Sequence, residues 1–186
     1  MLTEEEIEGI VERALTEDHA RNDVTTELLV DSKVTGKAVI VSKGLGVLSG
    51  HICARKAFEL VDKGVSYRVS VEDGGAVENG VTIAVIEGSL RAILSAERTA
   101  LNFLQHLSGI ATLTRKFVDI ATSRGIKILD TRKTVPGLRL LEKQAVLHGG
   151  GLNHRKDLSE MILVKENHIL SAGGFDAMLS RHGGRI

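Results

Sequence analysis

The last third of the sequence alternates short apolar runs with helical patterns, and this alternation constrains the fold more than any other feature. The apolar runs are KILDT (127–131) and MILVK (161–165), and the helical patterns lie at 138–150 and 173–184. Strands that alternate with helices at such intervals are typical of βαβ units, in which the strands run parallel. The alternation therefore predicts a parallel α/β architecture for this part of the chain.

The first hundred residues indicate a compact α+β arrangement instead. Thr3 and Glu6 fit a capping box at the start of a helix whose apolar face begins at Ile7. β-branched residues and glycine breaks then predict strands, with helical patterns between and after them. We expect a loop at 17–29, strands within 36–50, 67–75 and 81–89 with a turn at 72–80, a helix at 51–64 closed by Gly64, and two further helices at 90–109 and 110–125.

The change of pattern divides the chain into two expected parts. Residues 1–105 would be an N-terminal α+β domain that includes the start of a linking helix, and residues 106–186 would be the parallel α/β part.

Composition excludes several classes of protein. The 24 basic and 24 acidic residues give no net charge, and aromatic residues make up only 3%, so general binding to nucleic acid or to an anionic membrane is not expected. No apolar run approaches the roughly 18 residues that span a bilayer, and the acidic N-terminus is unlike a signal peptide. The single cysteine, Cys53, excludes an internal disulfide and is expected to be a buried thiol. We therefore expect a cytoplasmic protein.

Positive charge is nevertheless concentrated in the stretch DTRKTVPGLRLLEKQAVLHGGGLNHR (130–155). Arg132 and Lys133 follow the first apolar run, Lys165 ends the second, and His154 and Arg155 lie just before it. Because functional residues of parallel α/β folds gather where strands end, these side chains are expected on one rim. Arg and Lys together suit a ligand with several carboxylate or phosphate groups.

Two interpretations of this stretch stay open from the residues alone. Taken singly, each basic residue is more often a solvated surface charge than a ligand contact. Gly149–Gly151 could bring backbone N–H groups to a ligand, or could simply cap a helix.

Five segments in order carry a family resemblance. They are NDVTT, GVLSG, ERTALNFLQHLSGIATLT, LDTRKTVPGLR and KQAVLHGGGLNHRKDLSEMILVKENHI. Together they resemble quinolinate phosphoribosyltransferase, also called nicotinate-nucleotide pyrophosphorylase (carboxylating), from about Glu17 to about Ala177. The resemblance implies an N-terminal α/β open-faced sandwich followed by a parallel α/β barrel, which is incomplete (truncated) in this sequence.

The resemblance also implies a reaction and residue roles. The family makes nicotinate mononucleotide from quinolinate and phosphoribosyl pyrophosphate with Mg²⁺, releasing pyrophosphate and CO₂, in NAD biosynthesis. Its active site is shared across a homodimer or higher oligomer, and Arg98 would reach the quinolinate of the neighbouring subunit. Arg132 and Lys133 would be catalytic, with Lys133 contacting phosphoribosyl pyrophosphate. Quinolinate would be bound by Arg98, Arg132, His154, Arg155 and Lys165.

The sequence also departs from that pattern. A complete barrel of this kind requires about 250 residues, so the acidic residues for ribose and Mg²⁺ and the glycine-rich loop for the 5′-phosphate cannot be assigned here. We therefore expect a truncated product, a fragment or one piece of a larger assembly, with little activity alone. Two alternatives stay open: a related homologue associated with molybdate transport, and a non-catalytic chain that associates with a full-length homologue.

Overall fold

The computed structural model describes residues 3–182 and 184, except for the side chain of His182. The chain forms two compact units, Met1–His154 and Arg155–Ile186. Each unit is described by itself.

The first unit begins with two helices. In α1 (Glu4–Glu17) the capping box is confirmed, because the Glu6 N–H donates to Thr3 Oγ1 (3.2 Å) and the Thr3 N–H donates to Glu6 Oε2 (2.8 Å). The apolar face of α1 is buried from Ile7 onward. The predicted loop at 17–29 is wrong in its second half, which forms α2 (Val24–Leu29). Asp23 caps this helix by accepting the Thr26 N–H (3.0 Å), and six residues are too few to show helical periodicity in sequence.

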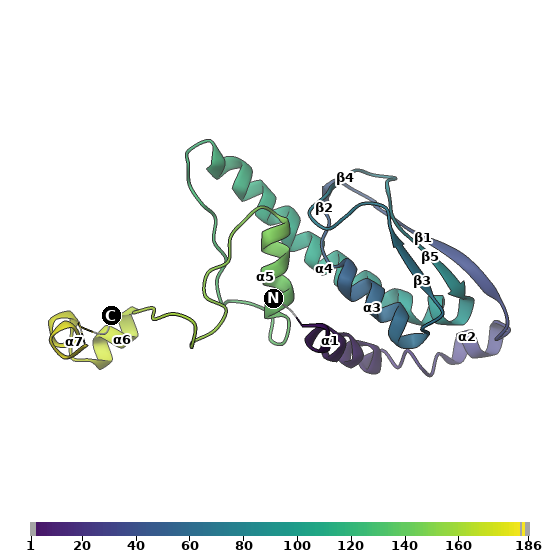
Figure 1. Cartoon of the computed structure of the whole chain (residues 1–186), viewed down its shortest axis with the longest axis horizontal. Coiled ribbons are helices and arrows are strands. Elements are labelled where there is room, and N and C mark those ends of the chain that lie inside the picture. The colour runs from purple at the N-terminus through teal and green to yellow at the C-terminus, as the bar shows by residue number, and fades with distance from the viewer. Residues whose placement is uncertain (1–2, 183, 185–186) are drawn as a thin grey trace. The chain divides into compact units, whose positions relative to one another are not determined.

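A three-stranded antiparallel sheet lies at one side of this unit, with two helices beside it (Figure 1). Its order is β1 (Thr35–Val41), β5 (Thr82–Ser89) and β3 (Ser66–Val69), so the predicted strands are confirmed. Alternate residues of β1 are exposed and half-buried, which shows that one face of the sheet is covered and the other is open. A second, two-stranded sheet pairs β2 (Gly46–Val47) with β4 (Ala76–Val77), which lies inside the predicted turn.

Helices α3 (His51–Val61) and α4 (Leu90–Thr122) pack against each other and against the sheet (Figure 1). The α3 helix ends three residues before the predicted Gly64, because Asp62 is extended and its side chain accepts the Gly64 N–H (2.8 Å). The α4 helix is one helix of 33 residues, so the prediction of two separate helices is wrong. Gly109 ended the first predicted helix, but a glycine within a helix costs only about 1 kcal/mol, and one face of α4 is buried on both sides of it.

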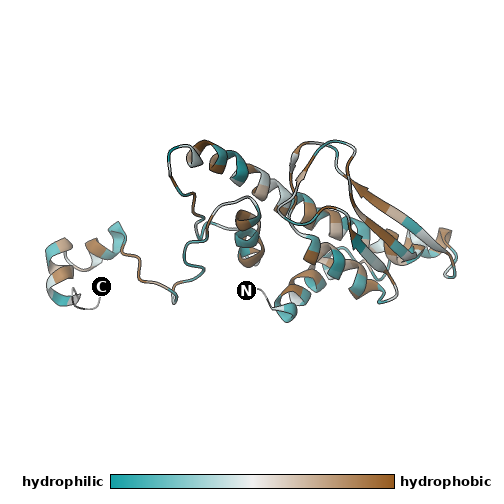
Figure 2. Cartoon of the chain, turned by 45° about the horizontal axis from the view of Figure 1, so that its top comes forward, coloured by the Kyte–Doolittle hydropathy of each residue, from teal (hydrophilic) through white to brown (hydrophobic). Residues whose placement is uncertain are grey.

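The core lies between the covered face of the sheet, α1, α3 and α4. Apolar and polar residues alternate along the ribbons of these helices and strands, as Figure 2 shows. The expected buried thiol is confirmed, since Cys53 is fully buried, and burial raises the pKa of this thiol to about 12. None of the helices within the described residues is long and apolar enough to cross a membrane.

The chain after α4 forms α5 (Arg139–His148), as predicted. The predicted strand at 127–131 is reduced to one parallel bridge, between Leu129 and Leu152. Two backbone bonds make it: Leu152 N–H donates to Ile128 O (2.8 Å) and Asp130 N–H donates to Leu152 O (3.0 Å). Residues 128–130 therefore pair with the backbone at Leu152, just after α5, and not with the apolar run at 161–165.

The second unit contains α6 (Glu166–Ser171) and α7 (Phe175–His182). The predicted strand at 161–165 is wrong: no strand is present within the described residues of this unit, so the run has no neighbouring strand there to pair with. The α6 helix was not predicted, whereas α7 confirms the helical pattern at 173–184. The predicted domain boundary after residue 105 falls inside α4 and stays a prediction.

Replacing Leu107 with alanine tests this description of the core. Leu107 is 2% exposed, so L107A should lower the free energy of unfolding by about 2–5 kcal/mol. Leu28 is 82% exposed, so L28A should change it by less than about 0.5 kcal/mol. Urea unfolding followed by circular dichroism measures both, and equal effects would contradict the assigned core.

Candidate active site

The loop Thr131–Leu138 carries Arg132 and Lys133 directly after the parallel bridge. Within the loop, the Lys133 N–H donates to Thr131 Oγ1 (3.1 Å) and the Leu138 N–H donates to Val135 O (3.1 Å). Lys133 is exposed, and Arg132 is half-buried. Nε of Arg132 is buried and has no hydrogen-bond partner within residues 3–182, so this guanidinium keeps an unused donor.

A buried ion pair lies behind this loop. Lys143 Nζ of α5 lies 2.6 Å from Asp130 Oδ1, and both side chains are almost fully buried. Lys143 Nζ also donates to the His154 carbonyl (2.9 Å), and the His154 N–H donates to Asp130 Oδ1 (2.8 Å). The pair therefore fixes the backbone of His154 next to the segment that leads into Arg132 and Lys133.

Asn153 completes this cluster. With its amide turned so that nitrogen faces the acceptors, the side chain donates to Asp130 Oδ2 (2.7 Å) and to Lys143 O (3.0 Å). Both oxygens of Asp130 are then used, which is what a buried carboxylate requires. The structure thus places the predicted residues Arg132, Lys133 and His154 after the two bridged segments, on the same side of the bridge.

The glycine run has a packing role. The N–H groups of Gly149, Gly150 and Gly151 donate to carbonyls of α5, so they are not free for a ligand. A Cβ at Gly149 would lie 2.5 Å from Ala111 O, and a Cβ at Gly151 would lie 2.8 Å from Val146 Cγ1. Of the two open interpretations, the helix cap is confirmed, and the glycines also allow close approach to α4.

His148, predicted as a C-terminal residue of a helix, is the last residue of α5. Its Nδ1 lies 2.8 Å from the buried Ser49 Oγ, and its Nε2 lies 3.1 Å from Gln144 Nε2. Ser49 belongs to the GVLSG segment that precedes α3. His148 therefore ties the N-terminal sheet region to the helix that carries Lys143.

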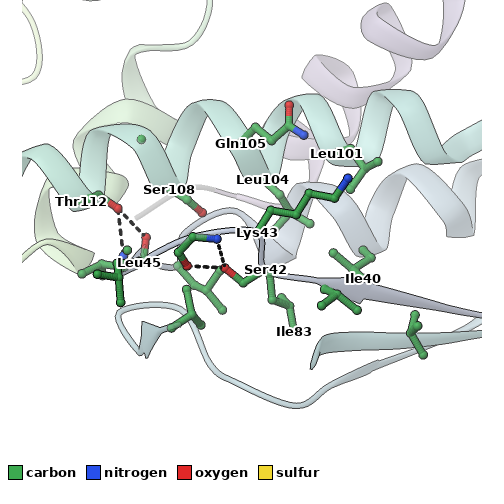
Figure 3. A pocket seen from close by; sticks show the side chains of 18 of the residues that line it. Ile40, Ser42, Lys43, Leu45, Ile83, Leu101, Leu104, Gln105, Ser108 and Thr112 are labelled. Carbon is green, nitrogen blue, oxygen red and sulfur yellow. Dashed lines mark hydrogen bonds between the residues drawn. The ribbon is translucent and has the colours of Figure 1, made fainter. Parts of the chain in front are cut away.

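Arg98 is exposed on α4 and lines a cleft of about 820 Å³ between α4 and the strands. Figure 3 shows Leu101, Leu104 and Ser108 of α4 on one side of this cleft and Ile40 and Ile83 of the strands on the other. Of the predicted site residues in the first unit, Arg98 lines this cleft, whereas Arg132, Lys133 and His154 do not.

Arg155 and Lys165 belong to the second unit. Arg155 Nη1 donates to the Met161 carbonyl (2.8 Å). Lys165 is exposed and precedes α6, where its N–H donates to His168 Nδ1 (3.0 Å). Lys165 therefore directly precedes the first turn of α6, in which the His168 N–H donates to the Lys165 carbonyl (2.9 Å).

Sequence reasoning missed the side chains that hold the site in place: Lys143, Asn153, Glu142 and His106 make these contacts. The sequence pattern does not indicate the burial of Lys143, because this residue falls on the side of the α5 helical wheel away from the apolar positions Leu141 and Ala145.

A cluster of metal ligands is not evident among the described residues. Across residues 3–182 and 184, no group of three or more His, Cys, Asp or Glu side chains could hold a metal ion. Asp130 is already bonded to Lys143 and to the His154 backbone. Its two oxygens therefore serve the fold, where they hold Lys143, Asn153 and the His154 backbone.

Two family models match the chain. The model of the quinolinate phosphoribosyl transferase N-terminal domain matches residues 23–108, and that of the C-terminal domain matches residues 110–184. The chain belongs to the quinolinate phosphoribosyltransferase family. The two matches meet within α4, which is continuous across them.

Similar proteins agree with this family. Quinolinate phosphoribosyltransferase [decarboxylating] 1b of Nicotiana tabacum is 40% identical over 94% of this chain and 50% of its own length. A probable nicotinate-nucleotide pyrophosphorylase [carboxylating] of Bacillus subtilis is 40% identical over 90% of this chain and 58% of its own. The chain thus spans about half the length of the curated relatives it matches.

A solved structure gives the same result for the fold. The nicotinate-nucleotide pyrophosphorylase from Francisella tularensis superposes with a TM-score of 0.91 at 38% identity, covering 100% of this chain and 66% of that one. The predicted α/β fold class, with an N-terminal sandwich and a partial C-terminal α/β domain, is confirmed.

Removing the Asp130 carboxylate should strongly lower the stability of the fold. D130A leaves the Lys143 ammonium buried without its partner, so the free energy of unfolding should fall by about 3–5 kcal/mol. Glu87 forms exposed pairs with Lys37 and Arg68, so E87A should cost less than about 1 kcal/mol. Guanidinium unfolding compares them, and a similar small effect for both would show that the pair is not structural.

Proposed function

We propose that the chain acts in the transfer of a phosphoribosyl group to quinolinate, giving nicotinate mononucleotide, pyrophosphate and CO₂ in NAD biosynthesis. The observation that carries the proposal is the Asp130–Lys143 pair, which holds His154 beside the loop of Arg132 and Lys133 in a chain of this family. The proposed setting is the cytoplasm.

The basic side chains bind and orient the two substrates in this proposal. Arg132, with its unused buried donor, offers a planar fork to one carboxylate of quinolinate. His154, Arg155 and Lys165 complete the set for the dicarboxylate, and the exposed Lys133 contacts the phosphates of phosphoribosyl pyrophosphate. Fixed cations of this kind also stabilise the negative charge that develops on pyrophosphate as it leaves.

The chemistry then depends on orientation more than on acid–base groups. The quinolinate ring nitrogen attacks the anomeric carbon of the ribose, and the bond to pyrophosphate breaks with its electron pair. The ring nitrogen is now cationic, so its charge stabilises the electron pair that stays on the neighbouring ring carbon when the carboxylate leaves as CO₂. A solvent proton replaces that carboxylate, and a dedicated base is not required.

Mg²⁺ is proposed to arrive with phosphoribosyl pyrophosphate, whose phosphate oxygens suit this ion. No step is assigned to a residue–metal contact, because the described residues contain no group that could hold the ion.

Arg98 is proposed to act on the quinolinate of a neighbouring subunit, which requires a homodimer or a higher oligomer. The position of Arg98 supports this, because Arg98 is exposed on α4 and lines the cleft described above. Arg132, Lys133 and His154 do not line that cleft.

Quinolinate binding by isothermal titration calorimetry tests the function. R132A should weaken binding by about 10-fold or more, because it removes a bidentate charged contact. K127A also removes one exposed positive charge nearby and should leave binding unchanged. Equal effects of R132A and K127A would contradict the assigned pocket, and the absence of binding by the wild type would favour the molybdate-associated or the non-catalytic alternative.

Mixing two variants tests the role of Arg98. R98A and R132A should each bind quinolinate weakly, but a reassociated mixture should regain about a quarter of the wild-type sites, because half of the dimers are mixed and each has one intact site. Calorimetric stoichiometry measures the recovery, and size-exclusion chromatography confirms reassociation. No recovery in reassociated dimers would place Arg98 and Arg132 in the same subunit's site.

A further inference from the structure

Glu142 is a buried carboxylate whose two oxygens hold two different parts of the molecule. Oε1 accepts a hydrogen bond from His106 Nε2 of α4 (2.8 Å), and Oε2 accepts the backbone N–H of Val135 (3.2 Å). Glu142 itself lies on α5 and is 8% exposed. One side chain therefore joins α4, α5 and the loop of Arg132 and Lys133.

The bond to Val135 acts where the loop turns back toward α5. Val135 precedes Pro136, which restricts Val135 to extended backbone and has no N–H of its own. Gly137 then takes a positive φ of 82°, which other residues rarely adopt. Because Pro136 restricts the backbone directly after the Val135 N–H, fixing this N–H also fixes the start of the returning half of the loop.

The bond to His106 connects this loop to the helix that carries Arg98. His106 follows Arg98 by eight residues on the continuous α4, a separation of about 12 Å along the helix axis. The position of the loop that carries Arg132 and Lys133 is thus fixed relative to α4, as well as to the loop's neighbours in sequence. Of the helices in the first unit, α4 is the most extensively packed.

We propose that Glu142 and His106 are positioning residues that hold the loop of Arg132 and Lys133 ready to bind its anionic substrate. The identity of that substrate as quinolinate rests on the proposed function. A loop that is already ordered loses less conformational entropy on binding, so its cations bind more tightly than those of a free loop. Neither residue needs to touch the substrate.

Two readouts test this: hydrogen exchange of the Val135 amide, measured by NMR, and quinolinate binding, measured by calorimetry. E142A should speed exchange at Val135 by about 10-fold and weaken binding by about 10-fold, the loss expected for one bond to a charged group. E142Q should restore most of both values, because its amide oxygen still accepts the Val135 N–H. The exposed pair residue Glu87 supplies the control variant E87A, which should change neither readout.

H106A keeps the experiment decisive if E142A does not fold. The His106 side chain is 39% exposed, so its removal should leave the fold intact while Glu142 loses one partner. Val135 exchange and quinolinate binding should then change in the same direction as in E142A, by about 3-fold. Unchanged exchange and binding in H106A would overturn the proposal.

The two proposals fail in different ways. If the wild type binds no quinolinate, the proposed function fails, and the Val135 amide alone decides the positioning role. Faster exchange in E142A with rescue in E142Q supports it, and unchanged exchange overturns it. If E142A and E142Q weaken binding equally, the charge of Glu142 matters and its hold on Val135 does not, which also overturns the proposal.

Discussion

The buried ion pair between Asp130 and Lys143 is the interaction on which the candidate site depends. Removing two charges from water is costly, and their attraction repays the cost only where further hydrogen bonds satisfy both groups. Here the His154 N–H, the His154 carbonyl and the Asn153 amide supply those bonds. The segments around Leu129 and Leu152 share only one bridge, so the pair provides the rigidity that a wider sheet would otherwise give.

Helix α4 is the second constraint, because it packs against both the sheet and the segments of the site. Small residues make this possible: Gly149 approaches Ala111 and Thr114 so closely that a Cβ would clash with both. Arg115 Nε of α4 also donates to the Gly149 carbonyl (3.0 Å), and this hydrogen bond further holds the end of α5 against α4. The positions of α5 and of Lys143 therefore follow from the packing on α4, and a break in α4 near Gly109 would separate the site from the core.

Local features of the fold could be predicted from the sequence, whereas features that depend on distant partners could not. The Thr3–Glu6 box and the strands of the first unit follow from short-range patterns. The bridge between Leu129 and Leu152, which Arg132 and His154 follow, joins segments that are distant in sequence, and no local pattern indicates it. The run at 161–165 has the composition of a strand, but a strand exists only where another backbone pairs with it. The burial of Lys143 and Glu142 could also not be predicted from the sequence, because charged side chains in amphipathic helices face solvent in most cases.

The structure separates the positive charge of 130–155 into two kinds. Lys143 is neutralised by Asp130 and bonded to the backbone, so its charge serves the fold. Arg132 and Lys133 have no ion pair within residues 3–182, and the desolvated Nε of Arg132 has no acceptor. A buried donor without a partner costs about 1–3 kcal/mol, and an anion that accepts from it recovers that cost. The same stretch can thus stabilise the native chain and still attract an anion, because different residues do the two tasks.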